Sequence, residues 1–210
     1  MKLTLGYSTE TDLVPLKPLL EGKINRDVVL ETIKVKEDEL KFMFSKFDLI
    51  YVPLPLINYI QDIKFLSNAA KVTDRIGLKG KCNDKVCVSS SNSTEYYYLK
   101  MFETKLTVSR GSDCECYVST DEVDEDLTAY WRKKCNDAPI ILKLIAVNLD
   151  EADIAKIKIA IRESASIMAS QNAIPQYSKE LGLKGRKGVE CFFDVCREVG
   201  LCSNNKYSIL

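Results

Sequence analysis

Short apolar runs alternate with helix-like stretches over the first 60 residues, and this alternation constrains the fold more than any other feature of the chain. Residues 2–7 alternate apolar and polar side chains, as strands do, and residues 28–35 predict a second strand. Residues 48–52, Asp-Leu-Ile-Tyr-Val, form a nearly continuous apolar run that is typical of a strand buried on both faces of a parallel sheet. Helices are predicted from about residue 13 and over residues 37–46. The order indicates an α/β fold with right-handed crossovers.

A second alternation begins after a basic, turn-rich stretch at residues 77–85. Strands are predicted at residues 86–88, 106–108, 115–118 and 139–147, and helices at residues 95–102 and from about 122 to 134. A long helix follows from residue 149, with apolar side chains at helical spacing on one face. These are Ile154, Ile157, Ile161, Ala165 and Met168. Residues 171–201 predict more helix, interrupted around 182–188, and the last residues predict a frayed tail.

Two lobes follow from the two alternations. We predict that each lobe is a mainly parallel sheet flanked by helices, with residues 1–80 and 149–210 forming lobe 1 and residues 81–148 forming lobe 2. Ligands of such sheets gather at the carboxyl ends of the strands. The sequence therefore predicts a ligand cleft between the loops that follow those strands.

Charge and composition exclude several classes of partner. The 30 lysines and arginines equal the 30 aspartates and glutamates, so no overall positive field attracts nucleic acid or an anionic membrane. No segment reaches the roughly 20 apolar residues that span a bilayer, and residues 140–147 are interrupted by Lys143. The amino-terminal residues lack the pattern of a secretory signal. We therefore expect a cytoplasmic protein without a nucleic-acid or membrane partner, and the sequence leaves open whether it forms a homodimer.

The eight cysteines and the absence of histidine limit metal chemistry. No Cys-x-x-Cys knuckle is present, so we expect neither a metal site nor a cofactor. Buried free thiols are the simplest interpretation of Cys191 and Cys196. Disulfides, for example between Cys82 and Cys87, remain an alternative in a hyperthermophile. The excess of lysine over arginine and the abundance of aliphatic residues favour a thermophilic source.

Three loops rich in hydroxyl groups carry the functional hypothesis. The loop at residues 89–94 follows an apolar strand and precedes a helix, whose free backbone N–H groups make a site for a carboxylate or phosphate. Helix capping alone also explains this loop, and it lacks the glycines and lysine of a nucleotide-binding loop. Two further loops place hydroxyl groups before acidic helix starts, and capping explains each of them equally well. The predicted ligand-binding residues are Tyr7, Ser8, Thr9, Tyr51, Ser89, Ser90, Ser91, Asn92, Ser93, Thr94, Ser119 and Thr120.

Catalytic residues have less support in the sequence. Without histidine the chain lacks the usual general base near neutral pH and any histidine-dependent triad. Glu10, Asp12 and Asp121 could supply a carboxylate, but each stands where a first-turn acid stabilises a helix. Cys87 is an alternative nucleophile, although a thiol on a buried strand is usually inert. The sequence therefore assigns no catalytic residue.

The order of segments resembles the type II solute-binding fold. Within that fold it is similar to the chorismate dehydratase and dihydroxynaphthoate synthase family of the futalosine route to menaquinone. Residues 48–53, 88–94 and 139–164 carry the resemblance. The synthase depends on a histidine that this chain lacks, and the chain is shorter than typical members of either enzyme group, so the resemblance implies geometry more than activity.

We expect a cytoplasmic solute-binding-like protein that closes on a small anionic organic metabolite. One interpretation is that the protein is an archaeal relative of this family. The alternatives are a lyase-type enzyme on the same scaffold, related to menaquinone biosynthesis, and a structural protein with a vestigial cleft. Turnover of a bound acid would favour the enzyme, whereas absence of any cleft would leave only the structural protein.

Overall fold

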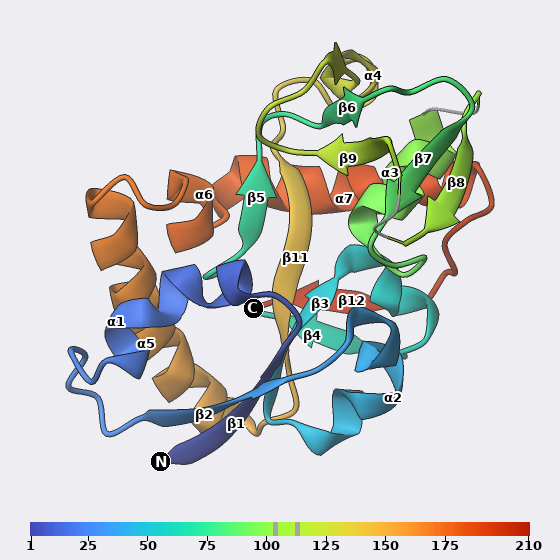
Figure 1. Ribbon diagram of the computed structural model, residues 1–210. Coiled ribbons are helices and arrows are strands. Elements are labelled where there is room, and N and C mark those ends of the chain that lie inside the picture. Colours follow the sequence, from blue (N-terminus) through green and yellow to red (C-terminus); the bar gives the residue numbers. More distant parts are fainter. Residues whose placement is uncertain (103–104, 112–113) are drawn as a thin grey trace.

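The protein folds around two β-sheets (Figure 1), and the computed structural model describes residues 1–102, 105–111 and 114–210. The first sheet has the order β12-β4-β11-β3-β1-β2, with β5 paired to β11 as well. Its strands are β1 (Lys2–Tyr7), β2 (Val29–Lys34), β3 (Leu49–Pro53), β4 (Ile63–Phe65), β5 (Lys71–Thr73), β11 (Ile140–Val147) and β12 (Tyr207–Ile209). The strand β1 runs parallel to both β2 and β3, as the first alternation predicts, whereas β11 runs antiparallel to its neighbours.

The second sheet has the order β10-β6-β9-β7-β8. Its strands are β6 (Gly77–Gly80), β7 (Lys85–Val88), β8 (Thr107–Arg110), β9 (Cys116–Ser119) and β10 (Glu125–Asp126). The strand β7 is parallel to β8 and β9, so these three carboxyl ends share one edge. If the chain is divided into lobes according to its two sheets, β6 belongs to the lobe of the second sheet and β11 to the lobe of the first. The lobe boundaries given above, 1–80 with 149–210 and 81–148, stay a prediction.

Helices connect and flank the sheets (Figure 1). The α-helices are α1 (Lys17–Leu20), α2 (Leu40–Met43), α3 (Thr94–Phe102), α4 (Thr128–Cys135), α5 (Glu151–Ser170), α6 (Gln176–Lys179) and α7 (Gly182–Glu198). The 3-10 helices are η1 (Glu10–Leu16), η2 (Glu37–Glu39), η3 (Phe44–Lys46) and η4 (Leu54–Asn58). No helix among the described residues is long and apolar enough to cross a membrane.

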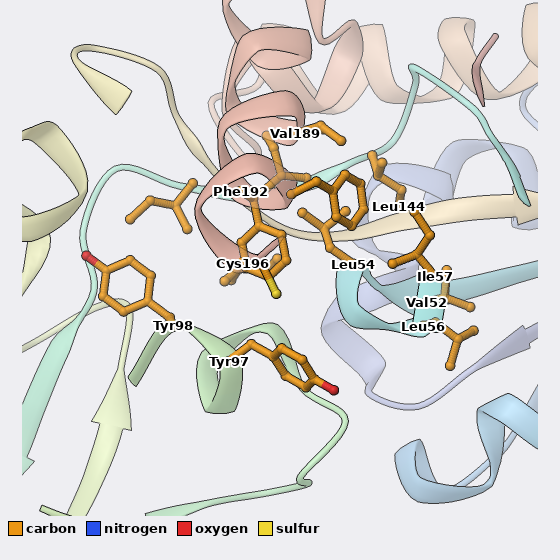
Figure 2. Packing of buried hydrophobic residues seen from close by; sticks show 14 of the residues in the cluster. Val52, Leu54, Leu56, Ile57, Tyr97, Tyr98, Leu144, Val189, Phe192 and Cys196 are labelled. Carbon is orange, nitrogen blue, oxygen red and sulfur yellow. The ribbon is translucent and has the colours of Figure 1, made fainter. Parts of the chain in front are cut away.

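The larger hydrophobic core contains residues of both sheets. Figure 2 shows the part of it in which α3 and α7 pack against residues of β3, η4 and β11. Val52 and Leu54 enter it from the first sheet side, and Tyr98 and Trp131 enter it from the helices of the second. Trp131 is 1% exposed, and its indole N–H donates to the carbonyl of Ala138. Helix α7 packs against both β11 and α4, so the core joins the two halves at this side of the molecule. A second core lies between β1, β3 and the helices α1 and α5.

Helix α5 confirms its predicted face. Asp150 caps it by accepting a hydrogen bond from the Asp153 backbone N–H at 2.9 Å, and Glu151 and Asp153 lie in the first turn, where the helix dipole favours them. The five side chains predicted to face the core are all buried. Capping and periodicity therefore predict both the start of this helix and its buried face.

Three expectations about helices and the tail are wrong. Helix α7 runs unbroken through Gly185 and Gly188, and Gly188 serves close packing, since a Cβ there would lie 2.4 Å from the Pro139 carbonyl oxygen. Helix α4 begins only at Thr128, after the short strand β10. The last residues form β12 beside β4, where Tyr207 packs on Phe193 at 4.6 Å between ring centroids.

All eight cysteines form disulfides. The pairs are Cys82–Cys116, Cys87–Cys114, Cys135–Cys191 and Cys196–Cys202. The interpretation of Cys191 and Cys196 as free thiols is wrong, and so is a Cys82–Cys87 pair. Sheet register explains the difference, since Gly80 of β6 pairs with Cys116 of β9 and thereby brings Cys82 beside Cys116. Two of the four bridges therefore lie within the second sheet and its loops.

Candidate functional site

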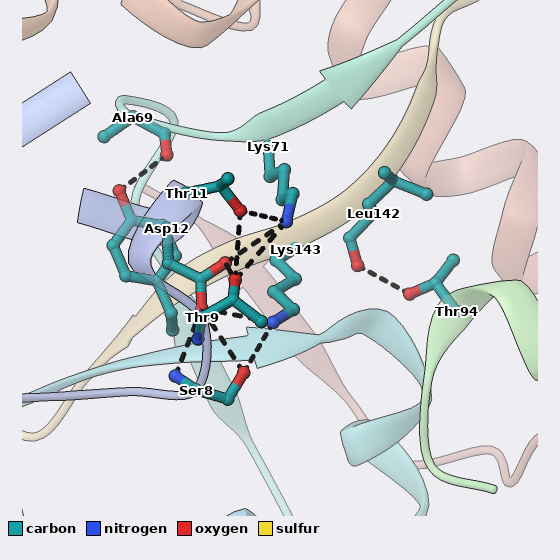
Figure 3. A network of polar contacts seen from close by, with 10 residues as sticks. Ser8, Thr9, Thr11, Asp12, Ala69, Lys71, Thr94, Leu142 and Lys143 are labelled. Atoms are coloured by element: carbon teal, nitrogen blue, oxygen red, sulfur yellow. Dashed lines mark hydrogen bonds and ion pairs between the residues drawn. The ribbon is translucent and has the colours of Figure 1, made fainter. Parts of the chain in front are cut away.

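Five polar residues meet where β1 ends, and we call Ser8, Thr9, Asp12, Lys71 and Lys143 the Asp12 cluster (Figure 3). Ser8 and Thr9 follow β1, Lys71 begins β5, and Lys143 lies within the fully buried β11. The Nζ of Lys143 lies 3.1 Å from Asp12 Oδ2 and donates to Ser8 Oγ at 2.6 Å. The Nζ of Lys71 lies 3.5 Å from Asp12 Oδ1. Two cations therefore share one carboxylate.

Asp12 is 1% exposed, and its carboxylate also accepts hydrogen bonds from Thr9. Burial on its own raises the pKa of a carboxyl group. The charges of Lys143 and Lys71 offset that effect at Asp12, and the hydrogen bonds from Thr9 add to theirs. The pKa of Asp12 therefore lies below its usual value, and the group is charged at neutral pH. One positive charge remains in the cluster, and Lys71, whose side chain is 31% exposed, is its accessible end.

Glu37 connects the Asp12 cluster to the second half of the molecule. Its Oε1 is buried and has no hydrogen-bond partner among the described residues. Burial raises the pKa of Glu37 above its usual value. Lys143 and Lys71 oppose this rise, whereas Glu95 of α3 and Asp12 add to it. Charged groups from both sheets therefore act on Glu37.

A pocket of about 630 Å³ opens at the carboxyl edge of the second sheet, and we call it the β7–β9 pocket. Ser89 follows β7, Gly111 follows β8, and Val118 is near the end of β9. Glu95 from the first turn of α3 and the half-exposed Tyr117 line it as well. Glu95 therefore lines the pocket and also acts electrostatically on Glu37, as Asp12, Lys71 and Lys143 do.

Asp38 bridges the same region. Its carboxylate accepts hydrogen bonds from the Ser90 hydroxyl and from Asn92 Nδ2, the latter at 3.4 Å. Its Oδ2 also lies 3.6 Å from Arg110 Nη1 at the end of β8. Asp38 belongs to η2 beside the first sheet, and its three partners belong to the second. These contacts tie the segment that holds η2 to the loop after β7 and to β8.

The loop at residues 89–94 mainly satisfies its own polar groups. Ser93 caps α3, because its Oγ accepts from the Tyr96 backbone N–H at 3.1 Å, and its own hydroxyl donates to the Ser90 carbonyl. The Thr94 hydroxyl donates to the Leu142 carbonyl at 2.6 Å (Figure 3). Ser90, Asn92, Ser93 and Thr94 are all buried. Capping therefore explains the inner part of this loop, and Ser89 and Ser91 are its more accessible hydroxyl residues.

The other predicted site residues lie in different surroundings. Tyr51 is fully buried and donates its hydroxyl to the Ala69 carbonyl at 2.9 Å. Burial raises the pKa of Tyr51 well above its usual value, and the nearby charge of Asp12 adds to this rise. Tyr7 is buried as well, with its hydroxyl 3.4 Å from Glu10 Oε1. Ser119 accepts from the Asp121 backbone N–H at 3.3 Å, as a turn residue does. The Thr120 carbonyl accepts a hydrogen bond from the Thr73 hydroxyl, and Thr120 is half-buried beside β5.

Sequence reasoning missed the charged residues of this region. A lysine within the otherwise apolar run at 140–147 was the available signal, because a buried lysine needs a partner. For Lys71, Glu37, Asp38 and Arg110 no sequence pattern indicated a shared location. Glu37 and Asp38 are neighbours in η2, whereas Lys71 belongs to β5 and Arg110 to β8, and the fold alone brings these three segments together.

The site contains no free thiol and no metal-ligand group within the described residues. Cys87 lines the β7–β9 pocket but is bonded to Cys114, so the alternative of a Cys87 nucleophile is wrong. Glu37 is the carboxyl group with a raised pKa in this region. The arrangement can therefore hold a charged solute and can exchange a proton at Glu37.

Comparisons with protein-family models and with curated sequences find no match. Solved structures do match. A protein from Archaeoglobus fulgidus aligns with a TM-score of 0.82 at 12% identity, covering 95% of this chain and 98% of that one. A Candida albicans protein described as having the generic periplasmic binding protein fold aligns with a TM-score of 0.58 at 13% identity, covering 98% and 92%. The alkanesulfonate-binding protein of Xanthomonas axonopodis bound to MOPS aligns with a TM-score of 0.57 at 11% identity, covering 97% and 94%.

These matches cover nearly the whole chain, and their identities show the fold alone. The α/β architecture with two sheets agrees with the expectation from the sequence. The sheets are mixed where mainly parallel ones were predicted, because β11 in the first sheet and β6 in the second run antiparallel to their neighbours. The chain has the two-lobed fold of the periplasmic solute-binding proteins.

Proposed function

We propose that the protein is a solute-binding-like protein that closes on a small organic anion between its two sheets. The observation that carries this proposal is the pair of lysines on the single carboxylate of Asp12. Lys71 is the more exposed of the two and donates to the neutral Thr11 hydroxyl at 2.8 Å, a contact that a ligand carboxylate can replace. A charge-assisted hydrogen bond is roughly twice as strong as a neutral one.

The second sheet supplies the other half of the proposed site. The β7–β9 pocket has the volume of a small-molecule site. Arg110 precedes Gly111 in its wall, and its distance of 3.6 Å from Asp38 leaves its guanidinium able to turn toward a ligand. We propose that the accessible hydroxyl groups of Ser8, Thr9, Ser89, Ser91, Ser119 and Thr120 complete the contacts.

A structural neighbour supports an anionic ligand. The alkanesulfonate-binding protein of the same fold holds MOPS, which carries a sulfonate group. Closure of this chain on a ligand uses the contacts of Asp38 with Ser90 and Arg110, which join η2 to the loop after β7 and to β8. Disulfides persist in oxidising compartments and in the cytoplasm of some hyperthermophiles. The proposed cytoplasmic location therefore implies that the protein comes from a hyperthermophile.

A thermal-shift screen tests the proposal. Small organic acids are compared with their uncharged amides at neutral pH. We expect at least one acid, at about 100 times its dissociation constant, to raise the melting temperature by about 5–10 °C, because ligand that binds only the folded state stabilises it by about 2.7 kcal/mol. The matching amide should give no such rise. A screen in which no acid stabilises the protein more than its amide contradicts the proposal.

The proton on Glu37 should make anion binding depend on pH. Burial raises the pKa of Glu37, so the carboxyl group is neutral below that pKa and repels an anion above it. We expect the affinity for the acid to fall as pH rises through the raised pKa. Glu37→Gln should keep the affinity of the protonated form and flatten the profile. Calorimetric titrations between pH 5 and 8 measure the affinity of the wild type and of Glu37→Gln. If the affinity of Glu37→Gln depends on pH as that of the wild type does, Glu37 is not the titrating group.

Glu37 also favours a second function, a lyase-type enzyme on the same scaffold. A buried carboxyl group with a raised pKa and an unpartnered oxygen is suited to act as a general acid. Incubating the protein with the stabilising acid and following it by NMR tests this alternative. New product signals that disappear in Glu37→Gln would support catalysis, and an unchanged ligand would leave binding alone.

A further inference from the structure

A second pocket lies away from the gap between the sheets. It has a volume of about 530 Å³ and is lined by one face of α5, by Lys64 of β4 and by Leu210, which follows β12. None of its lining residues belongs to the second sheet or to the Asp12 cluster. We call it the α5 pocket.

The wall of the α5 pocket combines apolar and cationic side chains. Ile154, Ala155 and Ile159 present an apolar surface, and Ile159 is 49% exposed. Lys158 and Arg162 continue the same helix face at spacings of three and four residues. Neither forms an ion pair with any described residue, and the same holds for Lys64 of β4. Three unpaired cations beside an apolar wall favour an anion with an apolar body.

A buried oxygen atom lacks a partner in the same wall. Asn68 is 1% exposed, and its Nδ2 donates to the Lys179 carbonyl at 2.8 Å and to Glu180 Oε2 at 2.9 Å. These two acceptors fix the orientation of the amide, because turning it over would place oxygen against oxygen. Its Oδ1 therefore stays without a hydrogen-bond partner. A ligand that donates an N–H or O–H to this atom removes the cost of the unmade hydrogen bond.

Two carboxylates also line the pocket and limit what it can hold. Glu180 is engaged with Asn68, and Glu151 lies in the first turn of α5, where the helix dipole stabilises it. The three cations outnumber them. A compact inorganic anion would leave the apolar wall uncovered, whereas an aromatic or aliphatic acid covers it.

We propose that the α5 pocket is a second binding site, separate from the gap between the sheets, for an amphipathic organic anion that carries a hydrogen-bond donor. The three cations bind the acid group, and the apolar face of α5 contacts the apolar body. Asn68 Oδ1 accepts a hydrogen bond from the ligand's donor after a local shift of the wall.

The fluorescent probe 8-anilinonaphthalene-1-sulfonate tests this proposal, since it has a sulfonate, an aromatic body and an N–H group. We expect one probe molecule to bind per full-length chain in low-salt buffer. Ala155→Trp fills the pocket and should abolish that binding. The double variant Lys158→Gln/Arg162→Gln should weaken it about tenfold by loss of charge. Lys71→Met, in the gap between the sheets, should leave it unchanged.

Partly unfolded protein also binds this probe, so melting temperatures are measured for every variant. Ala155 and Arg162 are exposed on a helix, and their replacement should leave the melting temperature within about 2 °C. The proposal is overturned if no stoichiometric site is found, if the Ala155 and Lys158/Arg162 variants bind as tightly as the wild type, or if Lys71→Met alone loses the probe.

Discussion

Lys143→Met should destabilise the protein by about 3–5 kcal/mol at neutral pH. Lys143 is 4% exposed and Asp12 is 1% exposed, so the replacement leaves a buried carboxylate with only the more distant Lys71 as an ion-pair partner. Urea denaturation followed by circular dichroism measures the loss. The double variant Asp12→Asn/Lys143→Met is the matched control, because it removes both charges and should recover a large part of the stability. A loss below about 1 kcal/mol in the single variant would contradict the buried pair.

The same pair predicts how the loss changes with pH. In the wild type the pKa of Asp12 lies below its ordinary value, so the pair contributes stability above pH 4 and loses that contribution as pH falls through the lowered pKa. Without Lys143 the pKa of Asp12 should rise, and protonation then relieves the buried charge. The difference in stability between wild type and Lys143→Met should therefore shrink as pH falls from 7 toward 4. A difference that stays constant over this range would exclude Asp12 as its origin.

Removing the Cys135–Cys191 disulfide should cost about 4 kcal/mol. This bridge joins α4 to α7 and closes a loop of 56 residues in the unfolded chain, and its loss therefore frees much conformational entropy. The variant Cys135→Ala/Cys191→Ala, with the other bridges intact, is compared with the wild type by denaturant unfolding under non-reducing conditions. Helix α7 also packs against β11, so the loss of this bridge loosens the side on which the two halves share a core.

The Cys196–Cys202 disulfide supplies the control for this prediction. It spans only six residues, and in the same chain-entropy treatment its removal costs about 2 kcal/mol. Both double variants remove one bridge between a buried and a partly buried cysteine and add two alanines, so their difference reports loop length. If the Cys196→Ala/Cys202→Ala variant loses as much stability as the Cys135→Ala/Cys191→Ala variant, strain or packing dominates and the loop argument fails.

Periodicity and turn chemistry predicted the parts of the fold that depend on local sequence. The buried face of α5 and the fully buried β3 follow from apolar spacing alone. The direction of the Tyr51 hydroxyl could not be predicted, because a strand buried on both faces does not show which side faces a ligand. Its contact with the Ala69 carbonyl depends on a connection 18 residues away.

The candidate site was predictable only at the level of its loops. Ser8 and Thr9 were identified from their place after a strand, and they lie in the Asp12 cluster. Asp12 was interpreted as a simple first-turn acid, because its two lysine partners are 59 and 131 residues away in the sequence. The cysteine pairs were missed for the same reason, since strand register decides which cysteines meet.

Calorimetric titration of the stabilising acid into three proteins tests the central claim most directly. The three proteins are the wild type and two variants that each lack one lysine. Lys71→Met removes a lysine of the Asp12 cluster, and Lys64→Met removes a lysine of the α5 pocket. We predict that Lys71→Met weakens binding by roughly tenfold or more, whereas Lys64→Met binds like the wild type. Equal affinities of Lys71→Met and wild type, or a loss confined to Lys64→Met, would show that the anion is not held between the sheets.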